Sequence, residues 1–329
     1  MTEKSAVPTI EARSGPCCGD DCCGGEKPAS TAGTGQAATR PSPSVSRAGD
    51  TTTIVMPRAN AATAPAAAPL APGADPRAVV REKYGAVAEG GSCGCGCCAA
   101  PADDASALES LGYTAEQRAA IPEGADLGLG CGNPLAHAEL RPGETVLDLG
   151  SGAGIDCFLA AREVGPSGRV IGVDMTPAML ERARANRARV DAVNVEFRLG
   201  EIENLPVADA SVDAIISNCV VNLSPEKPRV FREALRVLKP GGRLIVSDLV
   251  LTRPLGDELR RNVDLYVGCV AGAAQKDEYV RLIREAGFGD VRIVEERGYS
   301  VGLENLPPGS PEREAFAAVV SVKVRATKS

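Results

Sequence analysis

The segment that most constrains the fold is residues 145–154, where a short apolar run leads directly into a glycine-rich turn. Residues 146–149 have the composition of a buried strand, and residues 155–164 follow with a helical pattern. The turn between them contains Gly150, Gly152 and Gly154. Glycines at the carboxyl end of a parallel strand let a bound nucleotide approach the backbone closely. The segment therefore predicts a strand–turn–helix unit at the centre of a nucleotide-binding α/β sheet.

The residues around this turn indicate which nucleotide derivative would bind. A second apolar run, residues 169–173, ends on Asp174, whose carboxylate can accept both hydroxyl hydrogens of an adenosine ribose. The glycine spacing is Gly-x-Gly-x-Gly rather than the Gly-x-Gly-x-x-Gly of a dinucleotide site. Asp148 would repel a phosphate but suits a ligand with a cationic amino-acid end. Together these features favour S-adenosylmethionine (AdoMet) over NAD, and a glycine-rich structural turn is the alternative.

Strand and helix patterns alternate after the turn. Thr176-Pro177 starts a helix that should run to about residue 189, and a second helix is expected over 228–237, stopped by residues 240–242. Further strands are expected over residues 195–198, 211–217 and 243–248. This alternation predicts a doubly wound, mostly parallel sheet of the class I AdoMet-dependent methyltransferase type, with its ligand at the carboxyl ends of the strands. The residues expected to bind AdoMet, with Ile202 against the adenine, are Tyr84, Asp148, Gly150, Gly152, Gly154, Asp174, Met175, Ile202, Glu203 and Asn218.

Composition divides the chain into four parts. Residues 1–75 are rich in Ala, Pro and Ser and are expected to be disordered, because they hold too few large apolar side chains to offset the entropy of ordering. Residues 76–125 form a helical segment with a cysteine-rich loop, and residues 126–255 form the AdoMet-binding core. Residues 256–329 add helices and an antiparallel pair of edge strands. The elements expected outside the core are helices 77–88, 115–121, 257–266 and 275–286 and strands 291–296 and 319–325.

Charge and hydropathy exclude several classes of partner. The net charge is −7 and there is no basic stripe, which argues against nucleic acid. No apolar run reaches the length of a membrane span, and residues 1–10 lack the apolar core of a signal peptide. We therefore expect a cytoplasmic protein, monomeric, with no membrane partner.

The chain contains twelve cysteines, which is many for a cytoplasmic protein. Without a secretion signal, they are better explained as ligands of a soft element and as redox thiols than as a disulfide framework. Four of them lie within residues 93–98, where zinc is possible, but no second Cys-x-x-Cys stands at a finger spacing and the single histidine, His137, has no evident role. The tail cysteines are equally consistent with scavenging and with no role; they are Cys17, Cys18, Cys22 and Cys23.

Three further cysteines are placed to act near the nucleotide pocket. Cys219 ends the strand 211–217, Cys269 follows the helix 257–266, and Cys131 lies between two glycines on a loop before the first strand. The thiolates of Cys219 and Cys269, with a third from Cys131 or the 93–98 loop, would form a site of three sulfur ligands. Trivalent arsenic takes three such ligands in a pyramid and keeps a lone pair, so methyl transfer to it needs no general base. Cys157, on the helix after the glycine turn, is expected to pack.

Five stretches carry a resemblance to one family: Leu-Gly-Cys131-Gly-Asn-Pro, Leu-Asp148-Leu-Gly-Ser-Gly-Ala-Gly, Gly-Val-Asp174-Met-Thr-Pro, Ser-Asn218-Cys219-Val-Val-Asn-Leu and Gly-Cys269-Val-Ala-Gly. From about residue 79 onward the chain resembles the arsenite methyltransferases. The resemblance implies that arsenite or its thiol conjugates are the substrate, and that Cys219 and Cys269 hold the arsenic. It also implies that Cys131 and an upstream cysteine act as a redox pair and auxiliary ligands, reset by thioredoxin or glutathione. The upstream cysteine is one of Cys93, Cys95, Cys97 and Cys98, and the adjacent pair Cys97 and Cys98 is favoured.

Two other functions compete with this one. An AdoMet methyltransferase of an organic ring, such as a quinone, would share the core but would leave Cys131, Cys219 and Cys269 unexplained. A thiol-rich protein that sequesters or senses metalloids would explain the cysteines but not Asp148, Asp174 and the intact glycine turn.

Overall fold

The computed structural model describes residues 74–90, 105–299 and 308–329. All of these residues lie within the compact unit Asp50–Ser329. The tail expected to be disordered, residues 1–75, lies outside the described residues except for its last two positions, of which Asp75 is the N-cap of α1. The tail cysteines and the cysteines of the 93–98 loop also lie outside the described residues.

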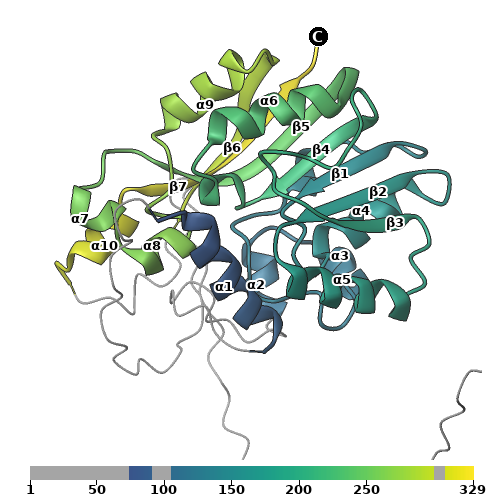
Figure 1. Ribbon diagram of the computed structural model, residues 1–329, viewed down its shortest axis with the longest axis horizontal. Helices are drawn as coiled ribbons and strands as arrows, with labels where there is room; N and C mark the ends of the chain where they lie inside the picture. The colour runs from purple at the N-terminus through teal and green to yellow at the C-terminus, as the bar shows by residue number, and fades with distance from the viewer. Residues whose placement is uncertain (1–73, 91–104, 300–307) are drawn as a thin grey trace, which may run out of the picture. The chain divides into compact units, whose positions relative to one another are not determined.

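The core of the described chain is one seven-stranded sheet of order β3-β2-β1-β4-β5-β7-β6 (Figure 1). Strands β1 to β5 are parallel, whereas β7 runs antiparallel between β5 and β6. This confirms the doubly wound sheet and the antiparallel pair at its edge. The strands are β1 (Thr145–Leu149), β2 (Arg169–Asp174), β3 (Val195–Leu199), β4 (Val212–Asn218), β5 (Leu238–Leu251), β6 (Gly289–Gly298) and β7 (Val319–Thr327).

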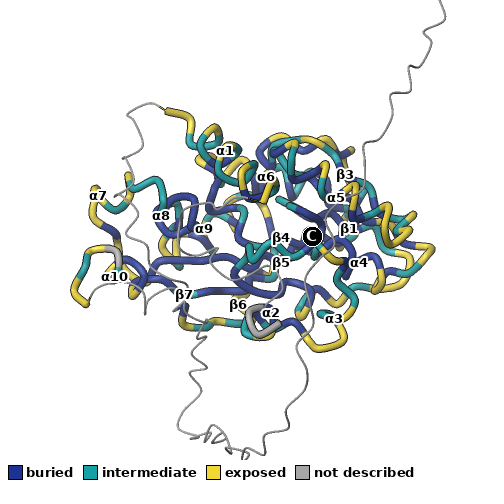
Figure 2. Tube along the Cα trace, turned by 90° about the horizontal axis from the view of Figure 1, so that it is seen from below, coloured by how far each residue is buried: buried dark blue, intermediate teal, exposed yellow. Residues whose placement is uncertain are grey.

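Helices cover both faces of the sheet, because alternate strand residues point to opposite faces. On β1, Leu147 and Leu149 pack with α6 and α9, while Val146 packs with α4 and α5. The helices are α1 (Pro76–Ala88), α2 (Ala105–Ser110), α3 (Ala115–Ala120), α4 (Ile155–Val164), α5 (Pro177–Arg189), α6 (Lys227–Val237), α7 (Asp257–Arg260), α8 (Val263–Val267), α9 (Lys276–Glu285) and α10 (Pro311–Phe316), with the 3-10 turns η1 (Pro134–His137) and η2 (Val221–Leu223). Figure 2 shows the inner strands buried and the outer turns of the helices exposed. The edge strand β6 is mostly exposed.

Several local expectations were wrong. Residues 240–242 lie inside β5, which begins directly where α6 ends, instead of forming a separate stop. The helix expected over 257–266 is split into α7 and α8, because the Asn262 side chain accepts a hydrogen bond from the Leu265 N–H and caps a new helix. Thr176 precedes α5 as expected, but its side chain makes no capping hydrogen bond. The short helices α2 and α10 were not predicted.

None of the helices in the described ranges combines the length and the apolar character that crossing a membrane requires.

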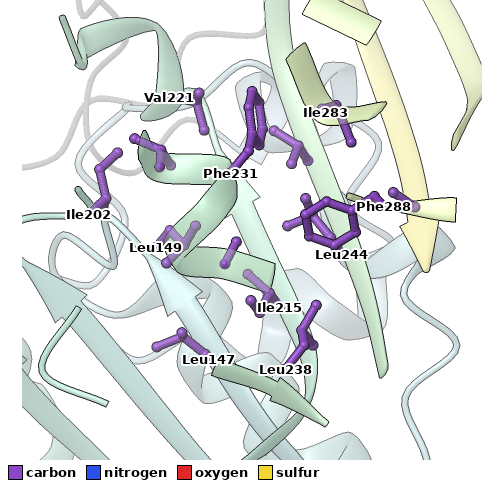
Figure 3. Close-up of a cluster of buried hydrophobic side chains, with 14 of the residues drawn as sticks. Leu147, Leu149, Ile202, Ile215, Val221, Phe231, Leu238, Leu244, Ile283 and Phe288 are labelled. Carbon is purple, nitrogen blue, oxygen red and sulfur yellow. The ribbon is translucent and has the colours of Figure 1, made fainter. Parts of the chain in front are cut away.

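Phe231 of α6 lies in the larger core cluster (Figure 3). Its ring packs edge-on against Tyr279 of α9 at a centroid distance of 5.5 Å. We expect Phe231→Ala to lower the free energy of unfolding by about 3–5 kcal/mol, because a 1% exposed ring leaves a cavity that its neighbours fill incompletely. Urea unfolding followed by circular dichroism measures the change. Val193→Ala, at a 74% exposed site, is the matched control. A loss of less than about 1 kcal/mol for Phe231→Ala would show that α6 and α9 are not held by this contact.

Candidate active site

A pocket lies at the carboxyl ends of β1, β2 and β4, with about 1000 Å³ of empty space that includes its open mouth. In open α/β sheets, ligands bind in the crevice outside the carboxyl ends of the strands. Every residue expected to bind AdoMet lines the pocket except Gly154. The structure thus brings together Tyr84, Asp148, Gly150, Gly152, Asp174, Met175, Ile202, Glu203 and Asn218.

The glycines after β1 have distinct roles. Gly150 and Gly152 have φ of 67° and 51°, which favours glycine, and a Cβ on Gly150 would collide with the side chain of Val220. Gly154, at φ 98°, is the N-cap of α4, and a Cβ there would approach Phe158 and Phe197 to 2.7 and 2.9 Å. Gly150 and Gly152 therefore shape the pocket, whereas Gly154 allows close packing behind it.

Asp174 ends β2 with its carboxylate at the pocket wall. Its Oδ2 accepts a hydrogen bond from the Gly152 N–H at 3.0 Å, and its Oδ1 accepts one from the Thr176 N–H at 2.8 Å. Burial raises the pKa of this carboxyl, and those backbone hydrogen bonds oppose the rise. Each oxygen keeps a further lone pair, so the carboxylate is fixed in place and can still accept from a vicinal diol.

Two buried carboxyls form another part of the wall. Asp148 on β1 accepts a hydrogen bond from the Cys157 thiol at 3.2 Å, so Cys157, expected only to pack, also orients this acid. Burial raises the pKa of Asp148 well above its usual range, and the nearby Asp156 charge raises it further. Asp156, in the first turn of α4, accepts from the Tyr113 hydroxyl at 2.8 Å. Such a pair of acids can recognise a cationic group.

Sequence reasoning missed Asp156 and Tyr113. Asp156 follows the glycine turn by two residues, in the first helical turn, and that position was an available signal. Tyr113 comes from the short loop between α2 and α3, and nothing in its local pattern indicates that its hydroxyl reaches Asp156.

Asp156 gives the protein a pH-dependent stability. Burial raises its pKa from 3.8 to about 6, against hydrogen bonds from Tyr113 and Asn218 that lower it. Between these values the folded protein binds a proton that the unfolded chain has lost, so this group's contribution to stability falls as the pH rises. We expect the wild type to lose about 2 kcal/mol relative to Asp156→Asn between about pH 4 and about pH 6. Urea unfolding of both proteins across this range measures the difference, and a constant difference would contradict the assignment.

Helix α1 contributes Arg77, Val80 and Tyr84 to the pocket wall. Tyr84 donates a hydrogen bond to the Val267 carbonyl at 3.1 Å, which ties α1 to α8. Arg77 forms ion pairs with Glu201 at 3.1 Å and with Glu203 at 3.9 Å. Glu203 is buried and also accepts from the Ser224 hydroxyl at 2.5 Å. Glu203, expected near the adenine, is therefore engaged by protein groups on two sides.

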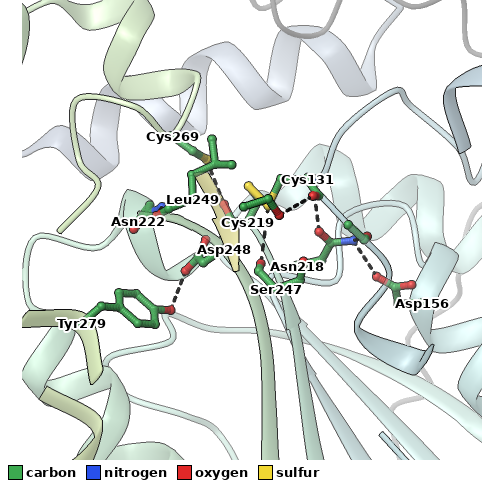
Figure 4. Close-up of a disulfide and its surroundings, with 12 residues drawn as sticks. Cys131, Asp156, Asn218, Cys219, Asn222, Ser247, Asp248, Leu249, Cys269 and Tyr279 are labelled. Carbon is green, nitrogen blue, oxygen red and sulfur yellow. Dashed lines mark hydrogen bonds between the residues drawn. A yellow bond between two sulfur atoms is a disulfide. The ribbon is translucent and has the colours of Figure 1, made fainter. Parts of the chain in front are cut away.

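A cysteine cluster lies at the edge of the pocket, which Cys219 lines. Cys131 and Cys219 form a disulfide across 88 residues of sequence, with their Cα atoms 5.8 Å apart (Figure 4). The Cys269 thiol donates to the Cys219 carbonyl oxygen at 2.9 Å. The three cysteines expected near the pocket are therefore neighbours on one side of the sheet.

The disulfide changes one expectation. Cys131 was expected to form a redox pair with an upstream cysteine, and the upstream cysteines lie outside the described residues. In this structure Cys131 is bonded to Cys219, a pairing that was not expected. The loop that carries Cys131 packs against the ends of β4 and β7: Asn218 Oδ1 accepts from the Cys131 N–H at 3.1 Å, and the Ser321 hydroxyl donates to the Cys131 carbonyl at 3.0 Å. These contacts bring the Cys131 sulfur to Cys219.

Backbone strain marks the same cysteines. Cys219 and Cys269 have φ of 59° and 64°, a region that non-glycine residues seldom occupy. The Cys219 N–H donates to the Ser247 carbonyl at 2.8 Å, and the Cys269 N–H donates to the Tyr266 carbonyl at 2.9 Å. Both strained conformations are thus fixed by the surrounding fold, as is common at functional sites.

Asn218 connects this cluster to the pocket. Besides accepting from Cys131, its amide donates to the Gly132 carbonyl at 2.7 Å and to Asp156 Oδ2 at 3.2 Å. The position of the Cys131 loop is therefore coupled through one side chain to the acidic wall of the pocket. His137, to which no role was assigned, instead contacts Glu295 at 2.9 Å.

Known proteins share this arrangement of sequence and fold. A methyltransferase-domain family model matches residues 140–287. An arsenite methyltransferase of Halobacterium salinarum is 51% identical over 263 residues, which cover 77% of this chain and 66% of that protein. Another, of Aquipseudomonas alcaligenes, is 48% identical over 179 residues, which cover 52% of this chain and 51% of that protein. The crystal structure of an arsenic(III) S-adenosylmethionine methyltransferase from Chlamydomonas reinhardtii is 35% identical, covers 69% of this chain and 74% of that one, and has a TM-score of 0.53.

The chain belongs to the arsenite methyltransferase family. This membership confirms the class I methyltransferase fold expected from the glycine turn and the alternation of strands and helices. The chain spans between about half and two thirds of the length of the two curated arsenite methyltransferases.

Proposed function

We propose that this protein transfers methyl groups from AdoMet to trivalent arsenic held by its cysteines. The observation that carries the proposal is the position of the cysteine cluster at the edge of the AdoMet-type pocket. Cys219 belongs to both, because it lines the pocket and bonds to Cys131. Cys269 lies against the Cys219 backbone on the same side.

The pocket fits AdoMet in three chemical respects. Gly152 leaves space where a Cβ would stand, Asp174 offers lone pairs to ribose hydroxyls, and the buried acids Asp148 and Asp156 complement an ammonium group. Bound there, AdoMet would supply an electrophilic methyl group on a sulfonium sulfur. Residues from α1, including Tyr84, would cover the ligand and exclude water.

Arsenite would enter the site only after the Cys131–Cys219 disulfide is reduced. Three thiols of Cys131, Cys219 and Cys269 would then displace three hydroxyls of As(OH)₃, with each thiol proton leaving in a water molecule. The bound arsenic keeps a lone pair that must point toward the pocket. Orientation of this kind is worth up to roughly 7–11 kcal/mol, so positioning rather than acid–base chemistry would supply most of the rate.

The disulfide also implies a reducing partner. We propose that thioredoxin or glutathione reduces Cys131 and Cys219 to thiols. We also propose that Cys97 or Cys98 forms a redox pair with Cys131 and serves as an auxiliary arsenic ligand. We also propose that the substrate arrives as arsenite or a thiol conjugate, and that the protein acts as a monomer.

Arsenic speciation tests the proposal. Protein incubated with AdoMet, arsenite and a thiol reductant should produce methylarsenicals, together with one S-adenosylhomocysteine per methyl group. Tight arsenic binding without product would instead support sequestration. AdoMet turnover on a quinone acceptor, with no methylated arsenic, would support an organic substrate.

A further inference from the structure

A buried acid that methyl transfer does not use lies beside the cysteines proposed to bind arsenic. Asp248 on β5 is 0% exposed, and Tyr279 donates to its Oδ2 at 2.7 Å. No hydrogen-bond partner is found for its Oδ1 within the described ranges. A carboxylate oxygen of Asp248 and the sulfurs of Cys131 and Cys219 all lie within 4.8 Å of one another. Figure 4 shows Asp248 between Tyr279 and the disulfide.

This donor set suits a divalent cation better than it suits arsenic. Two thiolates and a carboxylate form a mixed soft and hard set of the kind that zinc accepts, with a fourth position left for water. Arsenic(III) draws its affinity from sulfur, so the oxygen would add little to its binding. The Lys227 ammonium supplies one positive charge near Asp248. Three anionic ligands in a buried place need more counter-charge than this, which a divalent metal ion would supply. The Tyr279 hydroxyl would orient the carboxylate from behind.

We propose that the reduced protein binds Zn²⁺ through Cys131, Cys219 and Asp248, in competition with arsenite. A phosphine reductant breaks the disulfide by taking oxygen from water and leaves two thiols. Zinc then bonds to both sulfurs and to the Asp248 oxygen, and the thiol protons go to solvent. Cys269, whose sulfur is outside the group of three atoms, is not a ligand of this cation. The inference concerns the same cysteines as the proposed arsenic site but does not depend on methyl transfer.

The test uses the full chain with the eight cysteines outside the described residues changed to serine, so that they cannot bind metal. After reduction and anaerobic removal of the phosphine, Co²⁺ serves as a spectroscopic probe, and Zn²⁺ affinity is measured against a chromophoric chelator. We expect one equivalent of metal, with thiolate-to-cobalt charge-transfer bands and the strong visible bands of a tetrahedral site. Asp248→Asn should weaken zinc by at least about tenfold, whereas Asp277→Asn, an exposed acid on α9, should change it by less than about twofold.

Arsenite provides the comparison that separates the two sites. In Asp248→Asn its affinity should stay within about threefold of the parent, which also shows that the variant is folded. In Cys269→Ser we expect the opposite result, a weaker affinity for arsenite and an unchanged affinity for zinc. Equal zinc affinity in the parent and Asp248→Asn, no zinc binding by the parent, or parallel losses of zinc and arsenite in Asp248→Asn would each overturn the inference. None of these results bears on arsenite methylation by the unmodified chain, which speciation tests separately.

Discussion

Cys219→Ser is expected to lower arsenite methylation by about 1000-fold or more, because it removes the residue that joins the thiol cluster to the pocket. A hydroxyl cannot replace a thiolate as a ligand of a soft centre. A 1000-fold loss corresponds to about 4 kcal/mol, which is roughly half of the 7–11 kcal/mol that orientation can supply. The change is measured as initial rates of methylarsenical formation under saturating AdoMet and a thiol reductant.

AdoMet binding provides the internal control for Cys219→Ser. The glycine turn and the acids of the pocket are untouched, so calorimetry should give a dissociation constant within about threefold of the wild type. Loss of both AdoMet binding and turnover would mean that Cys219 supports the pocket itself. Retained turnover would remove Cys219 from the arsenic site altogether.

Asp174→Asn is expected to weaken AdoMet binding by about 100-fold. Asp174 accepts from the backbone N–H groups of Gly152 and Thr176, and an asparagine has one oxygen for these two donors. Its NH₂ group would face an N–H, and the charged acceptor for the ribose hydroxyls would be lost. Hydrogen bonds to charged groups contribute about 1.5–3 kcal/mol each, so the loss of one or two accounts for this factor.

Asp191→Asn is the matched control for this substitution. Asp191 is an exposed acid with φ 49°, a conformation that asparagine also tolerates, so AdoMet affinity should not change. Arsenite binding by reduced Asp174→Asn should also remain, because the cysteines are separate from this carboxylate. An unchanged AdoMet affinity in Asp174→Asn would exclude it as the ribose ligand.

Much of the fold could be predicted because its signals are local. Buried strands such as β1 are runs of apolar residues, and the glycines at 150 and 152 are needed by the conformation that shapes the pocket. The insertion of β7 between β5 and β6 follows from pairing between distant segments, so only an antiparallel edge pair could be expected. The division of the helix at Asn262 depends on one capping hydrogen bond, which propensity alone does not indicate.

Some residues of the candidate site could likewise be predicted from local sequence, and others could not. Asp174 and Cys219 could be placed because each lies at the end of a recognisable strand. The bond between Cys131 and Cys219 could not, since it depends on how the Cys131 loop packs against Asn218 and β7. Asp248 lies toward the carboxyl end of the long strand β5, where its local pattern gives no sign that it faces two sulfurs. Such residues become functional candidates only when tertiary structure brings them together.

X-ray absorption at the arsenic K-edge tests most directly whether separate segments of the chain bring their sulfurs to one arsenic atom. The sample is the reduced protein, with the eight cysteines outside the described residues changed to serine, loaded with arsenite and S-adenosylhomocysteine. We expect three sulfur neighbours and no oxygen neighbour, falling to two sulfurs in Cys269→Ser. Arsenic coordinated by oxygen atoms in place of sulfur would contradict the account. So would a number of sulfur neighbours that neither Cys219→Ser nor Cys269→Ser reduces.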